Sequence, residues 1–215
     1  MSATDASMLP RQPQRPSIVV GDVSALPDFN FGPTGLGWWG VVGFMLIEGM
    51  GFVLAIGVYF YLLPFERTWP PVPIAPPSLA WGTAFTVIGV LSVLPNIWLD
   101  KKARALDLPA VRLGMTLMSV VGLAMLVVRG FEFTALNVRW DQNAYGSITW
   151  ALLALHTTHI TTDVYDTLVL NVLVFRKNVD ARKFTDIADN GLYWNFIVAS
   201  WIVLYVIIYW TPRWL

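Results

Sequence analysis

Apolar residues occur in five long blocks along the chain, separated by short polar or proline-rich segments. The blocks lie at about residues 38–62, 79–99, 111–135, 147–175 and 192–211. Each block is long enough to cross roughly 30 Å of hydrocarbon as a helix, which takes about 20 predominantly apolar residues. The short connections predict an up-down arrangement. The pattern therefore predicts an all-α polytopic membrane bundle of five transmembrane helices.

Composition agrees with a membrane protein. Only 13% of the 215 residues are charged and 56% are hydrophobic, whereas a soluble domain carries about 25% charged residues. The polar stretch 1–37, with its several prolines, is predicted to be a mobile cytoplasmic tail. The bundle is expected to occupy 38–215. The net charge of zero gives no indication of a nucleic-acid partner.

Basic residues set the expected orientation. Most lysines and arginines flank the ends of the blocks on the side of the N-terminal tail: Arg11, Arg15, Lys101, Lys102, Arg104, Arg112, Arg176, Lys177, Arg182 and Lys183. The other side has fewer: Arg67, Arg129, Arg139 and Arg213. Because positive charge accumulates on the cytoplasmic side of a membrane, we expect the N-terminus inside and the C-terminus outside.

The fourth block contains a stripe of ionisable residues. At 100° per residue, four side chains fall within an arc of about 80° on one helical face: His156, His159, Asp163 and Asp166. An aspartate at mid-membrane costs roughly 2.5–3.5 kcal/mol on insertion scales, so such a stripe normally faces protein or water.

Three interpretations of this stripe are open. The pattern favours a hydrogen-bond network that fixes the register between helices. A chain of aspartates and histidines is also typical of proton relays. Two imidazoles and two carboxylates are suitable metal ligands, but one helix alone rarely completes a coordination shell. A second helix would have to supply a further ligand, and Glu48 is the only acidic candidate in the other blocks. No metal site is therefore predicted.

Glu48 is the single charge in the first block, about 15 Å from the tryptophan pair at the block's start. A carboxyl group in apolar surroundings favours its neutral form. It is expected either to form a structural hydrogen bond or to buffer protons beside an uptake path. Because Glu48 and the two histidines lie at similar depths, a hydrogen bond from Glu48 to His156 or His159 is a further hypothesis.

Two other polar positions are expected to be structural. Arg129 and Glu132 lie three residues apart at the outer end of the third block, and an interfacial ion pair is favoured over a functional role. Asn96 follows Pro95, which removes a helical hydrogen bond, and is expected to satisfy backbone groups.

The sequence offers no redox centre. It has no cysteine and only two histidines, so thiolate metal sites and iron–sulfur clusters are excluded. The histidines are three residues apart on one predicted helix, so they cannot ligate one haem from opposite sides. No catalytic residue, cofactor-binding residue or metal ligand is predicted.

Three motifs resemble subunit III of the haem–copper respiratory oxidases, the cytochrome c and quinol oxidases, over roughly residues 38–211. The first is a tryptophan–glycine helix entry followed by a lone buried glutamate. The second is Y-G-S followed by H-x-x-H, and the third is an aromatic C-terminal helix. The residues are Trp38-Trp39-Gly40 with Glu48; Tyr145-Gly146-Ser147 with His156 and His159; and Tyr193-Trp194, Phe196, Trp201, Leu204-Tyr205, Ile208-Tyr209-Trp210. Glu132 resembles the acidic residue that ends the preceding helix in the family.

The chain also departs from the family. The full-length family has seven helices, and this chain is expected to be of the five-helix type known in bacteria, without the first two. Asn195 stands where a histidine is usual, and Val198 where an aspartate is usual. Asp163 and Asp166 are not part of the family pattern.

The resemblance implies a non-catalytic, multi-pass subunit in the cell's inner (plasma) membrane. Haem and copper would belong to the partners, catalytic subunit I and the copper-containing donor-side subunit II. Family members hold phospholipid and support proton uptake and oxygen access during aerobic respiration and proton translocation. Two alternatives stay open: an accessory subunit of a nitric oxide reductase, and a free-standing small proton or ion transporter.

Overall fold

The computed structural model describes residues 30–33, 35–176 and 179–214, and the described part of the chain is all-helical. Most of the expected tail at 1–37 lies outside the described residues. Five long helices follow one another, with short helical turns after the first and the last. They are α1 (Leu36–Leu62), η2 (Leu63–Phe65), α2 (Leu79–Arg104), α3 (Leu108–Thr134), α4 (Ala144–Val174), α5 (Ala181–Tyr205), η3 (Val206–Trp210) and α6 (Thr211–Trp214). The predicted all-α class and the order of the five helices are confirmed.

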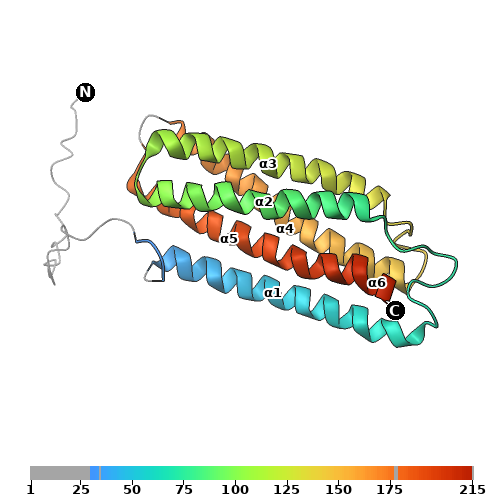
Figure 1. Ribbon diagram of the computed structural model, residues 1–215. Helices are drawn as coiled ribbons and strands as arrows, with labels where there is room; N and C mark the ends of the chain where they lie inside the picture. Colours follow the sequence, from blue (N-terminus) through green and yellow to red (C-terminus); the bar gives the residue numbers. More distant parts are fainter. Residues whose placement is uncertain (1–29, 34, 177–178, 215) are drawn as a thin grey trace, which may run out of the picture.

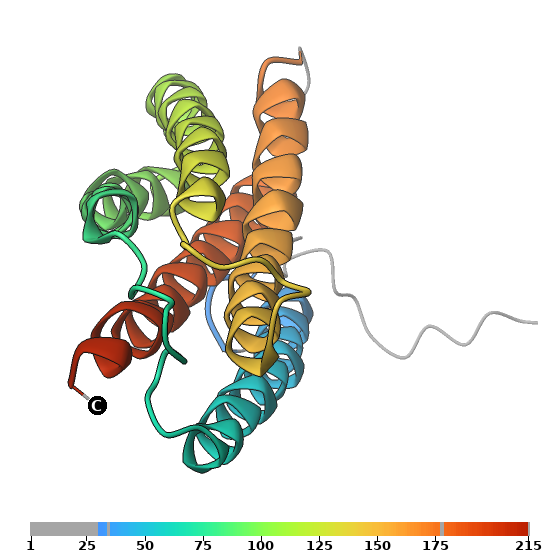
Figure 2. The ribbon, with the colours of Figure 1, turned by 90° about the vertical axis from the view of Figure 1, so that its right-hand side faces the viewer.

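Four of the long helices form a ring and the fifth lies outside it. Helix α2 packs on α3 and α5, and α4 also packs on α3 and α5, which closes the ring. Helix α1 packs along the groove between α4 and α5 (Figures 1 and 2). Because the helices alternate in direction, α1 begins at the opposite end of the bundle from the end reached by α6.

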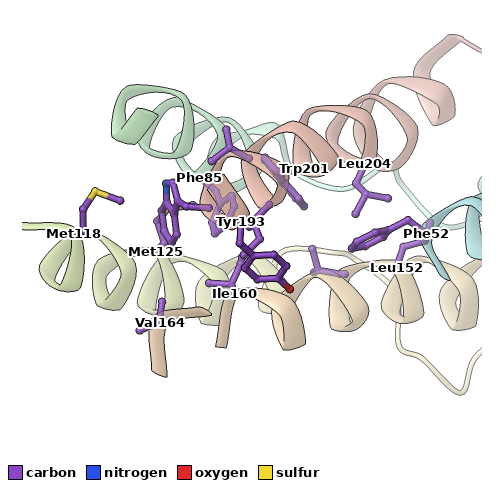
Figure 3. Packing of buried hydrophobic residues seen from close by; sticks show 14 of the residues in the cluster. Phe52, Phe85, Met118, Met125, Leu152, Ile160, Val164, Tyr193, Trp201 and Leu204 are labelled. Carbon is purple, nitrogen blue, oxygen red and sulfur yellow. The ribbon is translucent and has the colours of Figure 1, made fainter. Parts of the chain in front are cut away.

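Large apolar side chains from all five helices fill the interior. Figure 3 shows Phe52 of α1, Phe85 of α2, Met125 of α3, Leu152 of α4 and Trp201 of α5 within this core. All five side chains are buried. Burying such a side chain stabilises a protein by about 1.5–3 kcal/mol in water. In lipid the corresponding contribution comes from close packing.

Helix α5 begins about three turns earlier than the predicted start at residue 192. The additional turns begin at Ala181 and contain several charged residues. Because the predicted block consists of apolar residues, it does not extend over these turns. Their buried residues recur at helical spacing, at Phe184, Ile187, Ala188 and Gly191. This amphipathic segment continues the helix because its apolar side packs on the bundle.

Four of the helices are long and apolar enough to cross a membrane: Leu36–Phe65, Leu79–Arg104, Leu108–Thr134 and Ala181–Trp214. Helix α4, with 31 residues, is long enough, but its histidines, aspartates and threonines lower its average apolarity. Its buried polar residues, which include His156, His159 and Asp163, lie against α1, α3 and α5. The fold is that of a multi-pass membrane helix bundle.

Polar side chains bind α2 to α5 along the length of their contact. Trp194 Nε1 donates to Ser92 Oγ at 2.8 Å, and Trp201 Nε1 donates to Thr86 Oγ1 at 2.8 Å. Asn96 Nδ2 donates to the Gly191 carbonyl at 2.8 Å. Asn96 therefore satisfies a backbone group as expected, but one on α5. Such bonds fix the register of two otherwise apolar helices.

At the turn between α2 and α3, Asp107 caps the next helix. Its carboxylate accepts a bond from the Lys102 ammonium group at 3.0 Å and one from the Ala110 N–H at 3.3 Å. The lysine contact first, and then the backbone N–H, lower the pKa of Asp107. The negative charge also lies at the helix N-terminus, where it is favourable.

Gly122 allows α3 to approach α4 closely, and this gives a test of the packing. A Cβ added there would lie 2.6 Å from Val164 Cγ2, and valine side chains are stiff. We expect Gly122→Val to lower the free energy of unfolding by about 1–3 kcal/mol, measured by thermal unfolding in detergent. Gly130→Val, also on α3 but with nothing within 4 Å of its added Cβ, is the matched control. Equal melting temperatures for the two variants would contradict the packing described.

Candidate functional site

The stripe on α4 does not form one continuous site. His156, His159 and Asp163 are buried, whereas Asp166 is exposed. Each of the buried side chains faces a different set of neighbours, because α3, α5 and α1 cover successive parts of the helix. Two separate polar clusters result, one around Arg129 and one around Glu48.

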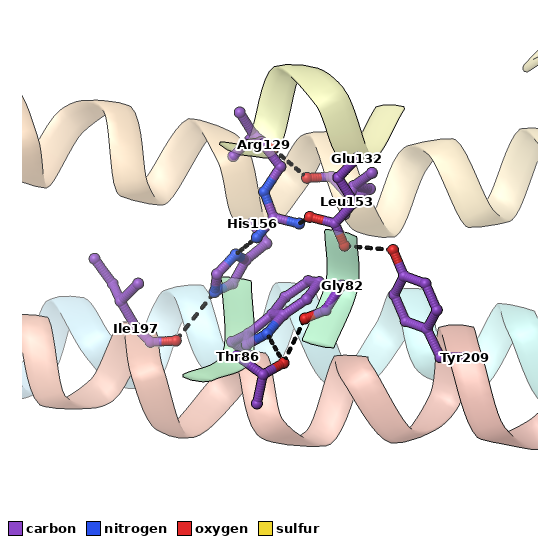
Figure 4. Close-up of polar contacts among 10 residues, drawn as sticks. Gly82, Thr86, Arg129, Glu132, Leu153, His156, Ile197 and Tyr209 are labelled. Carbon is purple, nitrogen blue, oxygen red and sulfur yellow. Dashed lines mark hydrogen bonds and ion pairs between the residues drawn. The ribbon is translucent and has the colours of Figure 1, made fainter. Parts of the chain in front are cut away.

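Arg129 is the centre of the first cluster (Figure 4). Its Nη1 donates to Glu132 Oε2 at 2.5 Å, and its Nη2 lies 3.0 Å from His156 Nδ1. The arginine side chain is 1% exposed and the glutamate 0%. A buried charge is tolerated when a partner neutralises it. Both terminal nitrogens of Arg129 are engaged in this way, while its Nε has no hydrogen-bond partner among the described residues.

The contacts of His156 define its tautomer. A guanidinium group only donates, so Nδ1 of His156 must accept. The ring proton is therefore on Nε2, which donates to the Ile197 carbonyl of α5 at 3.0 Å. Both ring nitrogens are engaged and the ring is neutral. His156 thus connects α3, α4 and α5 and has no nitrogen free to bind a metal or a substrate.

Aromatic side chains enclose the charged pair. The Arg129 guanidinium carbon lies 3.8 Å from the centre of the Phe85 ring and 4.0 Å from that of Trp201. Tyr209 donates to the second oxygen of Glu132 at 2.5 Å. Cation–π contacts are worth about 2 kcal/mol or more when they are desolvated. The sequence places the pair at the membrane boundary. The structure puts it in the last two turns of α3, fully enclosed by protein.

The partners of this pair are not predicted by the sequence. Tyr209 lies in the π-helical turn Val206–Trp210. An inserted residue rotates the following side chains by about 100° around the helix, so ordinary α periodicity does not indicate which way Tyr209 faces. One local signal exists at Gly82 of α2. A Cβ there would collide with the Tyr209 ring, so only glycine permits this approach.

Glu48 is the centre of the second cluster, between α1, α4 and α5. Its Oε1 lies 3.1 Å from His159 Nε2, and Tyr193 donates to its Oε2 at 2.5 Å. Of the two histidines considered from the sequence, His159 faces Glu48 and His156 faces Arg129. The Tyr193 contact is an additional one that the sequence did not indicate.

The Glu48–His159 contact is an ion pair when the imidazole is protonated. His159 Nδ1 lies 2.6 Å from the Leu155 carbonyl, which can only accept, so Nδ1 carries a proton. A proton between Nε2 and the carboxylate then gives either an imidazolium–carboxylate pair or a neutral imidazole with a carboxylic acid. Phe52, whose ring centre is 4.8 Å from that of His159, covers the pair.

The two aspartates lie further along the same helix, toward the end of the bundle where α1 begins. Asn190 of α5 donates to Asp163 Oδ1 at 3.1 Å, and Thr167 donates to Asn190 at 3.1 Å. Asp166 forms no side-chain hydrogen bond within the described ranges. Across those same ranges, no group of three or more His, Cys, Asp or Glu side chains is placed to hold a metal ion.

The Y-G-S motif shapes the start of α4. Tyr145 is buried against Trp69, with ring centres 5.0 Å apart. A Cβ on Gly146 would collide with the Arg139 carbonyl oxygen, so the connection before α4 requires glycine. Ser147 donates to the Trp140 carbonyl at 2.7 Å. The motif holds this connection against the helix and carries no chemistry of its own.

Comparison with known proteins agrees with the resemblance. No family model matches the sequence. The chain is 22% identical over 203 residues to cytochrome c oxidase subunit 3 of Thermostichus vulcanus, covering 93% of this chain and 96% of that protein. These comparisons support the subunit III family. The chain is also similar to two further cytochrome c oxidase subunit 3 proteins. It is 26% identical over 192 residues to that of Cyanidium caldarium, covering 80% of this chain and 66% of that protein. It is 23% identical over 183 residues to that of Synechocystis sp., covering 84% of this chain and 78% of that protein.

The subunit III resemblance drawn from the three motifs is thereby confirmed. The Thermostichus relative is matched over nearly its whole length, so it too is of about this size.

The Arg129–Glu132 pair gives the first test of the site. Arg129→Met leaves Glu132 buried without a counter-ion and should cost about 3–5 kcal/mol of the free energy of unfolding. The double variant Arg129→Met/Glu132→Gln removes both charges and should recover part of that loss, measured by thermal unfolding in detergent. A double variant as destabilised as the sum of the two single variants would show that the charges are not coupled.

Tyr193 gives the second test. Tyr193→Phe removes the hydroxyl that donates to Glu48 and should cost about 1–3 kcal/mol of the free energy of unfolding, because a hydrogen bond to a carboxylate is lost. It should also shift the infrared carboxyl band of Glu48. Tyr61→Phe is the control. Tyr61 lies on the exposed side of α1, the helix that carries Glu48, so its change should alter neither the free energy of unfolding nor the infrared band. No difference between the two variants would argue against a Tyr193–Glu48 bond in the membrane.

Proposed function

We propose that this chain is an integral membrane subunit of a haem–copper terminal oxidase, without a redox centre of its own. The observation that carries the proposal is the nearly full-length similarity to a protein named cytochrome c oxidase subunit 3. Oxygen reduction would take place in catalytic subunit I, and subunit II would carry copper on the donor side. Haem and copper would belong to those partners.

The geometry of the chain's own residues agrees with a supporting role. His156 is hydrogen-bonded to α3 and α5, His159 lies in an ion-pair contact with Glu48 of α1, and the chain has no cysteine. The Arg129 cluster joins α2, α3, α4 and α5 at a single point. Such a rigid bundle is suited to brace a neighbouring subunit.

Helix α1 offers a surface for that neighbour. It packs on α4 and α5 along one side, and its opposite side presents large apolar side chains: Leu46, Ile47, Met50, Val53 and Leu54. In a membrane these side chains face either lipid or another subunit. We assign this face of α1 to contacts with the catalytic subunit and the surrounding lipid.

An apolar groove on α4 fits a phospholipid. It has a volume of about 360 Å³, is lined by Leu168, Val172 and Leu173, and ends at Arg176. Acyl chains would lie on the leucines and valine while the guanidinium would bind a headgroup phosphate. Bound lipid of this kind, together with the apolar interior of the bundle, would support oxygen access.

The proposed topology has five spans with the N-terminus in the cytoplasm, in the plasma membrane of the cell. The basic residues described above carry this orientation through the positive-inside rule. With this orientation, the end of the bundle where α1 begins faces the cytoplasm, from which an oxidase takes up protons. Asp163 and Asp166 lie toward this end. Support of proton uptake is therefore part of the proposed function.

Purification of the native complex through an affinity tag on this chain tests the proposal. We expect haem absorbance to co-purify, with oxygen consumption driven by cytochrome c or a quinol. Nitric oxide consumption without oxygen consumption would reassign the chain to a nitric oxide reductase. A pure, stable, haem-free protein would contradict the proposal and leave a free-standing transporter.

A further inference from the structure

A cavity of about 520 Å³ opens between α1, α4 and α5 at the end of the bundle where α1 begins. One wall is apolar, formed by Val41 and Phe44 of α1 together with residues of α4. The other wall is acidic, with four carboxylates that lie on α4 and α5: Asp163, Asp166, Asp186 and Asp189. Asp163 and Asp166 are also the two residues that the family pattern does not explain.

Asp163 connects this cavity to the interior of the protein. It is only 1% exposed, and its Oδ1 accepts from Asn190. Its Oδ2 has no hydrogen-bond partner within residues 30–33, 35–176 and 179–214. A buried carboxylate oxygen without a partner is costly unless water or a cation satisfies it. Because Asp163 lines the cavity, water or a cation in the cavity would satisfy this oxygen.

The charges around the cavity favour a cation. Lys183 neutralises part of Asp186 through a contact of 3.1 Å. Arg104 of α2 and Asp189 line a smaller neighbouring cavity of about 140 Å³. No lysine or arginine among the described residues lines the larger cavity itself. The negative potential there would raise the local concentration of cations, protons included.

The carboxylates become more enclosed with depth, and the cavity ends at the Glu48 cluster. Asp186 and Asp189 are partly exposed, while Asp163 is buried. Tyr193 lines the same cavity and donates to Glu48 at 2.5 Å. Beyond Glu48 lies His159, whose Nε2 is 3.1 Å from Glu48 Oε1. A series of exchangeable groups thus leads from the mouth of the cavity to the half-buried Glu48.

We propose that this cavity is a water-filled acidic vestibule that delivers protons to Glu48 through Asp163 and Tyr193. In the last step the Asp163 carboxyl group gives its proton to a water molecule, this water gives one to the Tyr193 oxygen, and the hydroxyl proton of Tyr193 passes to Glu48 Oε2. The Asp163 carboxylate that remains is protonated again from the water of the cavity. The tyrosine ends neutral and Glu48 ends as a carboxylic acid. The inference deepens the proposed support of proton uptake and in that respect rests on the proposed function.

The vestibule is tested first by thiol accessibility, for which the cysteine-free chain has no background. Leu170→Cys puts a thiol on the cavity wall, and Val172→Cys puts one on the membrane side of the same helix. In the full-length chain in lipid nanodiscs, we expect the thiol introduced at position 170 to react with charged, water-soluble methanethiosulfonates. The cationic reagent should react at least tenfold faster than the anionic one.

The matched controls identify the source of that selectivity. Adding Asp163→Asn and Asp166→Asn should bring the two rates close together, and the thiol introduced at position 172 should stay unreactive. Equal reactivity of the thiols at positions 170 and 172, or no preference for the cationic reagent, would overturn the proposal.

Proton delivery is tested by the rate at which Glu48 is protonated after a rapid drop in pH. Time-resolved infrared spectroscopy follows the carboxyl band that Glu48→Gln removes. Asp163→Asn should slow its appearance at least tenfold, whereas Asp141→Asn, an exposed carboxylate in the connection between α3 and α4, should not.

An unchanged rate in Asp163→Asn, or the same slowing in Asp141→Asn, would overturn the proposal. Both measurements use the isolated full chain without haem. A failure of the oxidase assignment would appear in the haem content of the purified complex and not in these rates.

Discussion

The buried guanidinium of Arg129 is the group that the rest of the bundle must accommodate. A charge in an apolar interior requires a counter-ion and hydrogen bonds to its polar atoms. Here Glu132 supplies the charge, His156 accepts a bond, and two rings cover the faces of the guanidinium. These partners come from four helices, so a change in the register of one helix would leave a charge or a ring nitrogen without its partner. The pair therefore determines how the helices align.

This constraint explains why the α4 stripe is divided. His156 is neutral and fully engaged because Arg129 and the Ile197 carbonyl occupy both ring nitrogens. His159, less than one turn further along, faces Glu48 instead. One histidine consequently belongs to a closed network with balanced charge, and the other to a contact that is an ion pair when the imidazole is protonated. The same residue type performs two roles because α3 covers one part of α4 and α1 covers the next.

The sequence predicts the five helices well, because their apolar blocks are a strong signal over 20 or more residues. It misses the first turns of α5, where burial of an amphipathic face, from Phe184 onward, replaces overall apolarity. It also indicates the two histidines and Glu48 as buried polar groups. It does not identify their partners, since spacing along one helix carries no information about the rotation of the next. Tyr209 is the clearest case, because a π-helical turn alters its direction.

The two clusters differ in their access to water, and this difference assigns their roles. The Arg129 cluster is enclosed by rings on both faces, so its protons have no route to solution and its charges stabilise the packing alone. The Glu48 cluster is covered by Phe52 on one side and reaches an acidic cavity through Tyr193 on the other. A carboxyl group that lies beside an open cavity can exchange a proton without unfolding its surroundings. We therefore infer that the capacity for proton-linked behaviour lies at Glu48, while the Arg129 cluster keeps the helices that surround Glu48 in place.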